Sequence, residues 1–241
     1  GQTDIGMKRK TNQDSIALDH GNKFFIVADG MGGHNGGDIA SRLTVKNMPE
    51  LLKNNLDKEP KELLKLCVNE TNKIIYTKAQ EDESLKGMGT TVVAKLFKGP
   101  NLYVANVGDS RCYLFNNQKL FQVSKDHSFV QEKLNHAIYT RAEARFDKQK
   151  NVITRTVGFE PNVEVDVFTY KICKNDIFLI CSDGLHGKVS DSDITFIVNK
   201  YLADPATATS EDIQETVKVL IDQANANGGQ DNISVIISIA R

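Results

Sequence analysis

Four aspartates in the sequence share a local context that suits metal chemistry. Each is flanked by glycine and lies close to a predicted strand: Asp29, Asp109, Asp183 and Asp231. A carboxylate at the edge of a sheet is held rigidly, and glycine lets the backbone approach a ligand closely. One Asp-Gly pair is commonly just a turn. Four such aspartates indicate an acidic pocket, if the strand ends converge.

An acidic pocket of this kind needs cations, because uncompensated carboxylates repel one another. Oxygen ligands without a histidine or cysteine cluster favour hard ions such as Mg²⁺ or Mn²⁺. Two such ions about 3.5–4 Å apart can share a water molecule and lower its pKa, which suits attack on phosphorus. Arg9 is the best candidate to hold the phosphoryl oxygens, since a guanidinium binds two oxygens at once; the alternative is a solvated surface arginine.

The first aspartate follows an apolar run, residues 24–28, that is typical of a strand buried on both faces. It leads into the glycine-rich segment Gly30–Gly37. This segment lacks the Gly-Lys-Ser/Thr ending of a P-loop and the glycine spacing of a dinucleotide-binding loop. Taken alone, the stretch fits a metal or phosphate site and an ordinary turn equally well.

The elements that must position these residues are predicted from periodicity. Helical spacing covers residues 38–52, 60–80, 191–202 and 211–226. Strands are expected at 23–28, 90–97, 102–107, 112–115, 120–123, 163–170, 176–181 and 233–240. The adjacent strands between residues 90 and 123 predict an antiparallel meander and disfavour alternating β-α-β units. Residues 125–150 are charged and patchily helical, which fits a long insertion over a site or a pair of surface helices.

Composition places the chain among ordinary globular proteins: 241 residues, 40% hydrophobic and 25% charged. A formal net charge of −1 argues against a broad nucleic-acid-binding surface. No apolar run approaches the roughly 20 residues that span a bilayer, and no signal peptide is evident. The cysteines form no Cys-x-x-Cys pair, and free thiols indicate a reducing cytoplasm. We expect one domain over residues 1–241, monomeric and cytoplasmic, with no nucleic-acid or membrane partner.

Six motifs occur in order along nearly the whole chain. They are Arg9-Lys10-Thr11-Asn12-Gln13-Asp14, Val27-Ala28-Asp29-Gly30-Met31-Gly32-Gly33-His34, Gly87-Met88-Gly89-Thr90-Thr91, Asn106-Val107-Gly108-Asp109-Ser110-Arg111, Cys181-Ser182-Asp183-Gly184 and Gly228-Gly229-Gln230-Asp231-Asn232. Together they resemble the metal-dependent serine/threonine phosphatases of type 2C, and the Met31…His34 form resembles the bacterial branch. The resemblance implies an α+β fold, a four-layer αββα sandwich of two antiparallel sheets flanked by helices.

The same resemblance implies two or three Mn²⁺ or Mg²⁺ ions as cofactors. Asp29 would bridge two of them, the Gly30 carbonyl would bind one, and Asp183 and Asp231 would complete the other. Asp109 resembles the ligand of a third, weaker metal shared with Asp183.

Two further residues match catalytic positions of the family. Asp14 would hold metal-bound waters and Arg9 the substrate phosphate. Residues 125–150 resemble the family's flap, which varies between members and can tune substrate choice; here this segment contains no glycine.

The sequence departs from the family pattern at two positions. Many members have glutamate where Gln13 stands, so an acidic role is absent there. In animal relatives a histidine after the Asp-Gly pair is proposed as general acid, and here that position is Met31. His34 could protonate the leaving oxygen, since histidine titrates near neutral pH. Alternatively, His34 is an ordinary loop histidine and a metal-bound water serves as the acid.

We therefore predict hydrolysis of phosphoserine and phosphothreonine in phosphoproteins, with a cognate serine/threonine kinase or its substrates among the targets. The main alternative is a pseudophosphatase, a regulatory binding module without turnover. Retention of Asp29, Asp183, Asp231 and Arg9 argues against it. A two-metal phosphodiesterase or nuclease is the third possibility, disfavoured by the absence of a basic excess.

Overall fold

The computed structural model describes residues 1–32, 36–136, 138, 147, 149 and 151–241. Its strands form two sheets in which neighbouring strands pair antiparallel. The first has the order β2-β3-β5-β6-β9, with β4 paired to β3, and the second the order β1-β11-β10-β7-β8. The first sheet comprises β2 (Asp14–Asp19), β3 (Phe24–Met31), β4 (Gly89–Thr90), β5 (Val92–Lys98), β6 (Asn101–Val107) and β9 (Asp166–Lys171). The second comprises β1 (Gln2–Asp4), β7 (Arg111–Asn116), β8 (Lys119–Gln122), β10 (Ile177–Cys181) and β11 (Ile233–Ile239).

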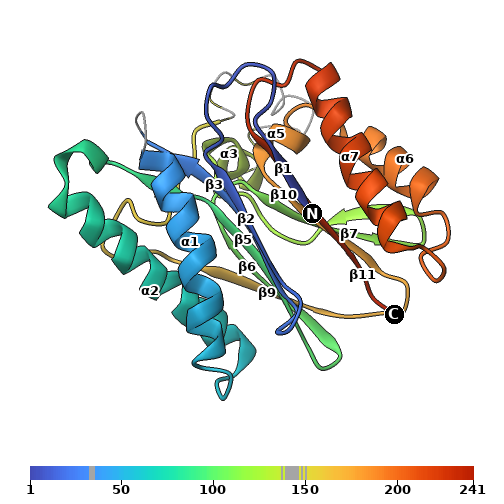
Figure 1. The fold of residues 1–241 in the computed structure, drawn as a ribbon, viewed down its shortest axis with the longest axis horizontal. Helices are drawn as coiled ribbons and strands as arrows, with labels where there is room; N and C mark the ends of the chain where they lie inside the picture. Colours follow the sequence, from blue (N-terminus) through green and yellow to red (C-terminus); the bar gives the residue numbers. More distant parts are fainter. Residues whose placement is uncertain (33–35, 137, 139–146, 148, 150) are drawn as a thin grey trace.

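Helices cover the outer faces of this sandwich (Figure 1). α1 (Gly36–Lys53) and α2 (Pro60–Glu81) lie on the first sheet, and α6 (Asp191–Tyr201) and α7 (Ser210–Ala226) lie on the second. The shorter helices are η1 (Glu83–Leu85), α3 (Phe129–Asn135) and α5 (Asp183–His186). The predicted αββα sandwich is therefore confirmed. Among the helices described, none has the length and apolarity required to cross a membrane.

Local sequence signals set several helix boundaries. Pro60 occupies the first turn of α2, where its missing N–H breaks no hydrogen bond. Thr209 and Asp212 form a reciprocal capping box at the start of α7. These signals explain why α2 and α7 begin within one residue of the starts predicted from periodicity.

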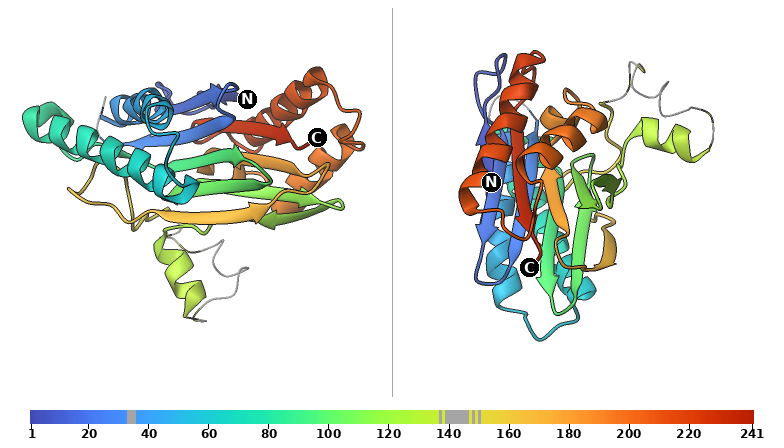
Figure 2. Two further views of the ribbon diagram at one scale, coloured as in Figure 1. Left: turned by 90° about the horizontal axis from the view of Figure 1, so that it is seen from below. Right: turned by 90° about the vertical axis from the view of Figure 1, so that its right-hand side faces the viewer.

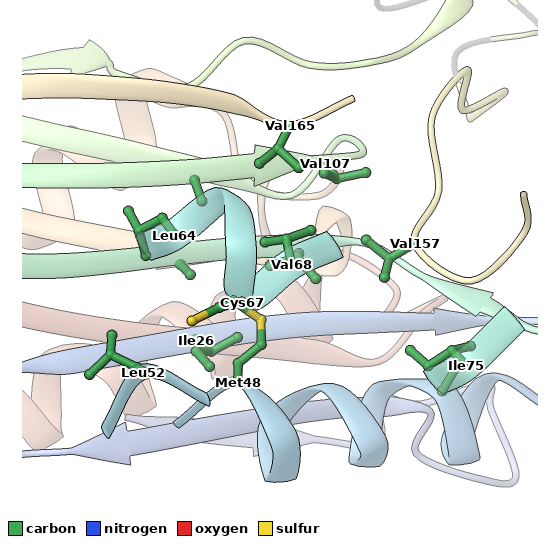
Figure 3. Close-up of a cluster of buried hydrophobic side chains, with 14 of the residues drawn as sticks. Ile26, Met48, Leu52, Leu64, Cys67, Val68, Ile75, Val107, Val157 and Val165 are labelled. Carbon is green, nitrogen blue, oxygen red and sulfur yellow. The ribbon is translucent and has the colours of Figure 1, made fainter. Parts of the chain in front are cut away.

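Three apolar layers hold the sandwich together. One joins α1 and α2 to the first sheet; Figure 3 shows Ile26 of β3 in this layer with Met48 and Leu52 of α1 and Leu64 and Cys67 of α2. A second joins the C-terminal helices to the other sheet. The third lies between the two sheets. The strands β3, β5, β6, β7, β10 and β11 bury most of their side chains on both faces, which is why their sequences read as nearly continuous apolar runs.

The structure corrects two details of the strand prediction. The strands between residues 90 and 123 are not one meander, because β6 belongs to the first sheet and β7 to the second. The chain crosses between the sheets at residues 108–110. Asp29 also lies inside β3, which continues to Met31 by pairing with β4, instead of at the strand end. In addition, β1 and β2 escaped prediction, because β1 has only three residues and β2 is mostly only partly buried.

One charged side chain lies in the layer between the sheets. Lys95 of β5 is fully buried, and its Nζ donates to Ser238 Oγ at 2.8 Å and to the Phe178 carbonyl at 3.3 Å. Nζ also lies 5.4 Å from the centre of the Phe25 ring. Burial lowers the pKa of Lys95 to about 7, because an ammonium ion loses its hydration there.

Lys95→Met should raise the free energy of unfolding at pH 7 by about 1–4 kcal/mol, since an apolar side chain of similar length avoids the desolvation cost. The folded pKa lies below the unfolded value of about 10.4, so the unfolded state binds more protons between these values. Wild-type stability should therefore rise from about pH 7 to about pH 10, and the advantage of the variant should shrink. Urea unfolding of both proteins at pH 7 and 9 measures this difference. A less stable variant, or a difference independent of pH, would contradict the prediction.

Candidate metal centre

The predicted acidic residues come from different elements and meet at one end of the sandwich. Asp14 of β2 pairs in register with Asp29 of β3. Asp183 is the first residue of α5, directly after β10, and Asp231 precedes β11. Asp109 stands where the chain crosses between the sheets. The convergence of strand ends on which the acidic pocket depends is therefore present.

Two cavities meet at these residues. The larger, of about 910 Å³, is lined by Arg9, Asp29 and Gly30, and the smaller, of about 410 Å³, by Asp109. Asp183 and Asp231 line both cavities. A group bound between these two aspartates would thus be reached from either side.

Asp14 connects the two sheets through its carboxylate. Its Oδ2 accepts hydrogen bonds from Ser182 Oγ at 2.8 Å and from Ser234 Oγ at 2.7 Å. Ser182 follows β10 and Ser234 belongs to β11, so both donors come from the second sheet, whereas Asp14 belongs to the first. These bonds fix the orientation of a buried carboxylate and leave its Oδ1 for another ligand or for water.

Two threonines position Asp29 and tie it to the next part of the site. The Asp29 N–H donates to Thr91 Oγ1 at 3.1 Å, and the Asp29 carbonyl accepts from the Thr91 N–H and from Thr90 Oγ1. Thr91 Oγ1 also lies 2.8 Å from Ser110 Oγ, beside Asp109. The Gly-Thr-Thr motif therefore joins the strands that present Asp29 and Asp109.

The glycines after Asp29 allow a close approach between β3 and α1. A Cβ on Gly30 would lie 2.0 Å from the Gly37 carbonyl oxygen, and one on Gly37 would lie 2.7 Å from the Gly30 carbonyl carbon. The Gly30 N–H donates to the Gln13 carbonyl at 3.1 Å. No side chain fits between these backbones, so packing requires glycine at positions 30 and 37.

Burial and mutual repulsion disfavour ionisation of these carboxyl groups. Burial raises the pKa of Asp14 to about 7 and that of Asp183 to about 6. Burial, reinforced by the charges of neighbouring aspartates, raises the pKa of Asp29 and Asp109 well above the ordinary value. Two described arginines lie near these carboxylates, but Arg111 is engaged by Asp126 at 2.7 Å and Arg9 by Asp231 at 2.6 Å. The pocket is therefore short of positive charge.

The donor set fits a hard divalent cation. Asp109 Oδ1 and Asp183 Oδ1 are buried and lack a hydrogen-bond partner in the part of the chain described, an arrangement that a cation would satisfy. Among the described residues, however, no group of three or more His, Cys, Asp or Glu side chains is already arranged to hold an ion. Asp231 Oδ2 is engaged by Arg9 Nη2 at 2.6 Å.

The loop bearing Arg9 is held against the other site residues. The Met7 and Lys8 N–H groups donate to the Gly229 carbonyl, and Asn232 Nδ2 donates to the Ile5 and Thr11 carbonyls. The Arg9 side chain is half exposed, so its ion pair with Asp231 is weak, about 0–1 kcal/mol. This ion pair therefore holds Asp231 only weakly.

Sequence reasoning missed the residues that support the carboxylates. Ser234 is a polar residue within an apolar strand, and Ser182 adjoins Asp183 in a recognised motif; either feature could have signalled a buried role. Asn232 is nearly fully buried and belongs to one of the six motifs, but the sequence did not indicate that it supports the Arg9 loop. His186, whose Nε2 lies 3.0 Å from the Asp109 carbonyl oxygen, was also overlooked.

Some predicted features lie partly or wholly outside the described residues. His34 is one of them, so its predicted role as proton donor is untested. Met31, at the position of the animal general acid, is half-buried, with its sulfur 3.6 Å from Thr156 Oγ1. Of the flap, residues 125–150, the described part includes α3, which projects from the sandwich (Figure 2).

The fold and the site define a class of protein: an αββα sandwich with an acidic pocket where the two sheets meet. Residues 7–229 match the family model described as Protein phosphatase 2C. The chain belongs to the protein phosphatase 2C family, and the resemblance to its bacterial members is confirmed.

Similar proteins agree with this assignment. The serine/threonine phosphatase stp of Listeria monocytogenes is 35% identical over 243 residues, which cover 98% of this chain and 93% of that protein. The crystal structure of Mycobacterium tuberculosis serine/threonine phosphatase PstP/Ppp has a TM-score of 0.89 at 31% identity, with 100% of this chain and 97% of the other covered. A PstP catalytic domain in complex with 2 manganese ions has a TM-score of 0.83 at 32% identity, covering 100% and 96%.

Ser234→Ala should weaken Mn²⁺ binding by about 10–100-fold, because outer partners that orient a ligand have effects of that size. The change removes one of the two hydroxyl donors to Asp14. Calorimetric titration with Mn²⁺ measures the affinity. Ser15→Ala is the matched control, since Ser15 follows Asp14 on β2 but pairs with Ser41. Equal affinities in the two variants would contradict a supporting role for Ser234.

Proposed function

We propose that this protein hydrolyses phosphoserine and phosphothreonine in phosphoproteins with two or three Mn²⁺ or Mg²⁺ ions. The observation that supports this function most strongly is the crowding of buried carboxylates, short of cations, beside an arginine at the mouth of a cleft. Such a pocket is stable in its charged form only with bound cations. Family membership and the names of the similar proteins point to the same activity.

Each site residue has a proposed role. Asp29 and the Gly30 carbonyl would hold the two principal ions, with Asp183 and Asp231 completing the set and Asp109 joining Asp183 at a third. When bound, the ions supply an activated water and neutralise the phosphoryl oxygens.

The remaining chemistry belongs to side chains of this chain. Arg9 would bind two phosphoryl oxygens and so fix the orientation of the phosphate for attack. Asp14, fixed by its two serine donors, would orient water at the metal site. His34 remains the proposed donor of a proton to the leaving oxygen, with a metal-bound water as the alternative.

The substrates of a phosphatase of this family are phosphoproteins. We propose further that they include a cognate serine/threonine kinase or its substrates. We also propose that residues 1–241 act as one catalytic domain with a flap at 125–150, and that the protein is monomeric and cytoplasmic. Four free cysteines, three of them buried, are consistent with a reducing compartment.

Asp29→Asn should lower phosphate release from a phosphothreonine peptide, with Mn²⁺ present, by more than about 100-fold. Loss of a ligand should exceed the 10- to 100-fold effects of outer-shell partners. Asp57→Asn, on the exposed turn between α1 and α2, is the control and should leave turnover unchanged.

The same assay separates the competing functions. A wild-type protein that releases no phosphate with any divalent metal would be a pseudophosphatase. Faster hydrolysis of bis(p-nitrophenyl) phosphate than of p-nitrophenyl phosphate would instead identify a phosphodiesterase.

Arg9→Ala should lower kcat/KM for the phosphopeptide by about 10–100-fold, since hydrogen bonds between charged groups contribute about 1.5–3 kcal/mol. Arg9→Lys should recover only part of this loss, because an ammonium lacks the guanidinium fork. Lys10→Ala changes an exposed cation on the same loop and serves as the control. A loss of equal size in Lys10→Ala would show that the loop acts only through its overall charge.

A further inference from the structure

The larger cavity is lined by apolar side chains as well as by acidic ones. Besides Arg9 and Asp29, it is lined by four large apolar side chains: Met31, Ile153, Phe159 and Val163. Met31 follows the metal-binding segment, whereas the other three come from the chain that follows the flap. A substrate segment with its phosphate at Arg9 would therefore share this cavity with apolar side chains.

Phe159 is the most exposed of these side chains. It is 60% exposed, although burying an aromatic ring would be favourable. Exposed apolar side chains at the mouth of a cleft mark binding surfaces more often than isolated ones do. The surrounding chain determines whether Phe159 is fixed in place.

Asn72 of α2 holds the loop that bears Phe159. Its Oδ1 accepts a hydrogen bond from the Gly158 N–H at 2.6 Å, and its Nδ2 donates to the carbonyls of Glu160 at 2.9 Å and Pro161 at 3.2 Å. Asn72 is only 1% exposed. A single buried amide thus clamps the backbone on both sides of Phe159.

Two neighbouring residues strengthen this anchor. Val157 is fully buried in the same apolar cluster as Ile75 of α2 (Figure 3), and it exchanges two backbone hydrogen bonds of 2.9 Å with Thr90. Gly158 has a φ of +90°, and a Cβ there would lie 2.1 Å from Ile75 Cγ2. Phe159 is therefore an exposed ring on a fixed backbone, two residues from the buried Val157.

We propose that Phe159 determines substrate specificity. With Met31, Ile153 and Val163 it forms an apolar subsite that binds an apolar side chain adjoining the phosphorylated residue of the substrate. Asn72 is the positioning residue of this subsite. The inference rests on the proposed function, because the phosphate at Arg9 sets which part of the substrate reaches Phe159.

The charges around the subsite favour an apolar occupant over an acidic one. Glu160 and Glu164 also line the cavity, and Arg155 is engaged by Glu164 at 2.9 Å and Asp166 at 3.0 Å. An acidic substrate side chain would thus meet two carboxylates and a cation that already has partners.

The test uses phosphothreonine peptides that carry leucine or serine immediately before or after the phosphorylated residue. With Mn²⁺ present, the wild-type kcat/KM should favour leucine about tenfold at one of these positions, the low end for an apolar contact. Phe159→Ser should reduce the ratio to about one. Phe159→Leu should retain most of the preference, because it keeps an apolar side chain in place.

Two further variants separate contact from general effects. Asn72→Ala should raise KM for the leucine peptide more than for the serine peptide, which a uniform loss of stability would not do; thermal unfolding monitors its folding. Phe196→Ala is the matched control, since Phe196 is an exposed aromatic, 67% exposed, on α6. Its leucine-to-serine ratio should equal that of the wild type.

A wild-type ratio near one at both positions would overturn the inference, as would a preference that Phe159→Ser leaves intact. Hydrolysis of p-nitrophenyl phosphate by each variant reports whether the metal site still works. A wild-type protein that hydrolyses none of the phosphopeptides would overturn the proposed function, and this inference with it. Specificity and activity can thus fail separately.

Discussion

The site depends on one buried carboxylate that joins the two sheets. Asp14 belongs to the first sheet, and both hydroxyl groups that hold its carboxylate come from the second. Hydrogen bonds are stronger where water is excluded, as it is around this buried carboxyl group. The relative position of the two sheets, and of the aspartates that each presents, is therefore fixed at this point.

Around Asp14, the topology gathers like charges that would separate if they were free. Strand register places Asp14 opposite Asp29, and the chain crosses between the sheets at Asp109. Thr91 connects these two regions through Ser110. Repulsion and desolvation oppose this arrangement, and the three apolar layers compensate for it. The clustered aspartates thus lower the stability of the fold at one end of the sandwich, and bound cations would offset this loss.

The same scaffold fixes the surroundings of the acidic pocket. The Arg9 loop is held by Asn232, and the Phe159 loop is held by Asn72; each asparagine is buried, and each satisfies carbonyl groups of a loop that lines the cleft. A loop whose backbone is already fixed loses less conformational entropy when its exposed side chains bind a ligand. The two asparagines thus fix the loops that bring Arg9 and Phe159 to the same cleft.

The sequence by itself determined the family, the αββα fold class, the long helices and the set of aspartates, because periodicity and ordered motifs are written in neighbouring residues. Two predictions from the sequence were wrong: Asp29 lies inside β3 and not at its end, and the strands between residues 90 and 123 belong to two sheets. Neither the pairing of β4 nor the crossover between the sheets leaves a local signal. Only the tertiary structure showed that Ser182 and Ser234, 168 and 220 residues from Asp14, hold its carboxylate. It also decided that Lys95 is buried and that Asn72 fixes Gly158, 86 residues away. Such contacts depend on which distant segments the fold brings together, and no local pattern specifies them.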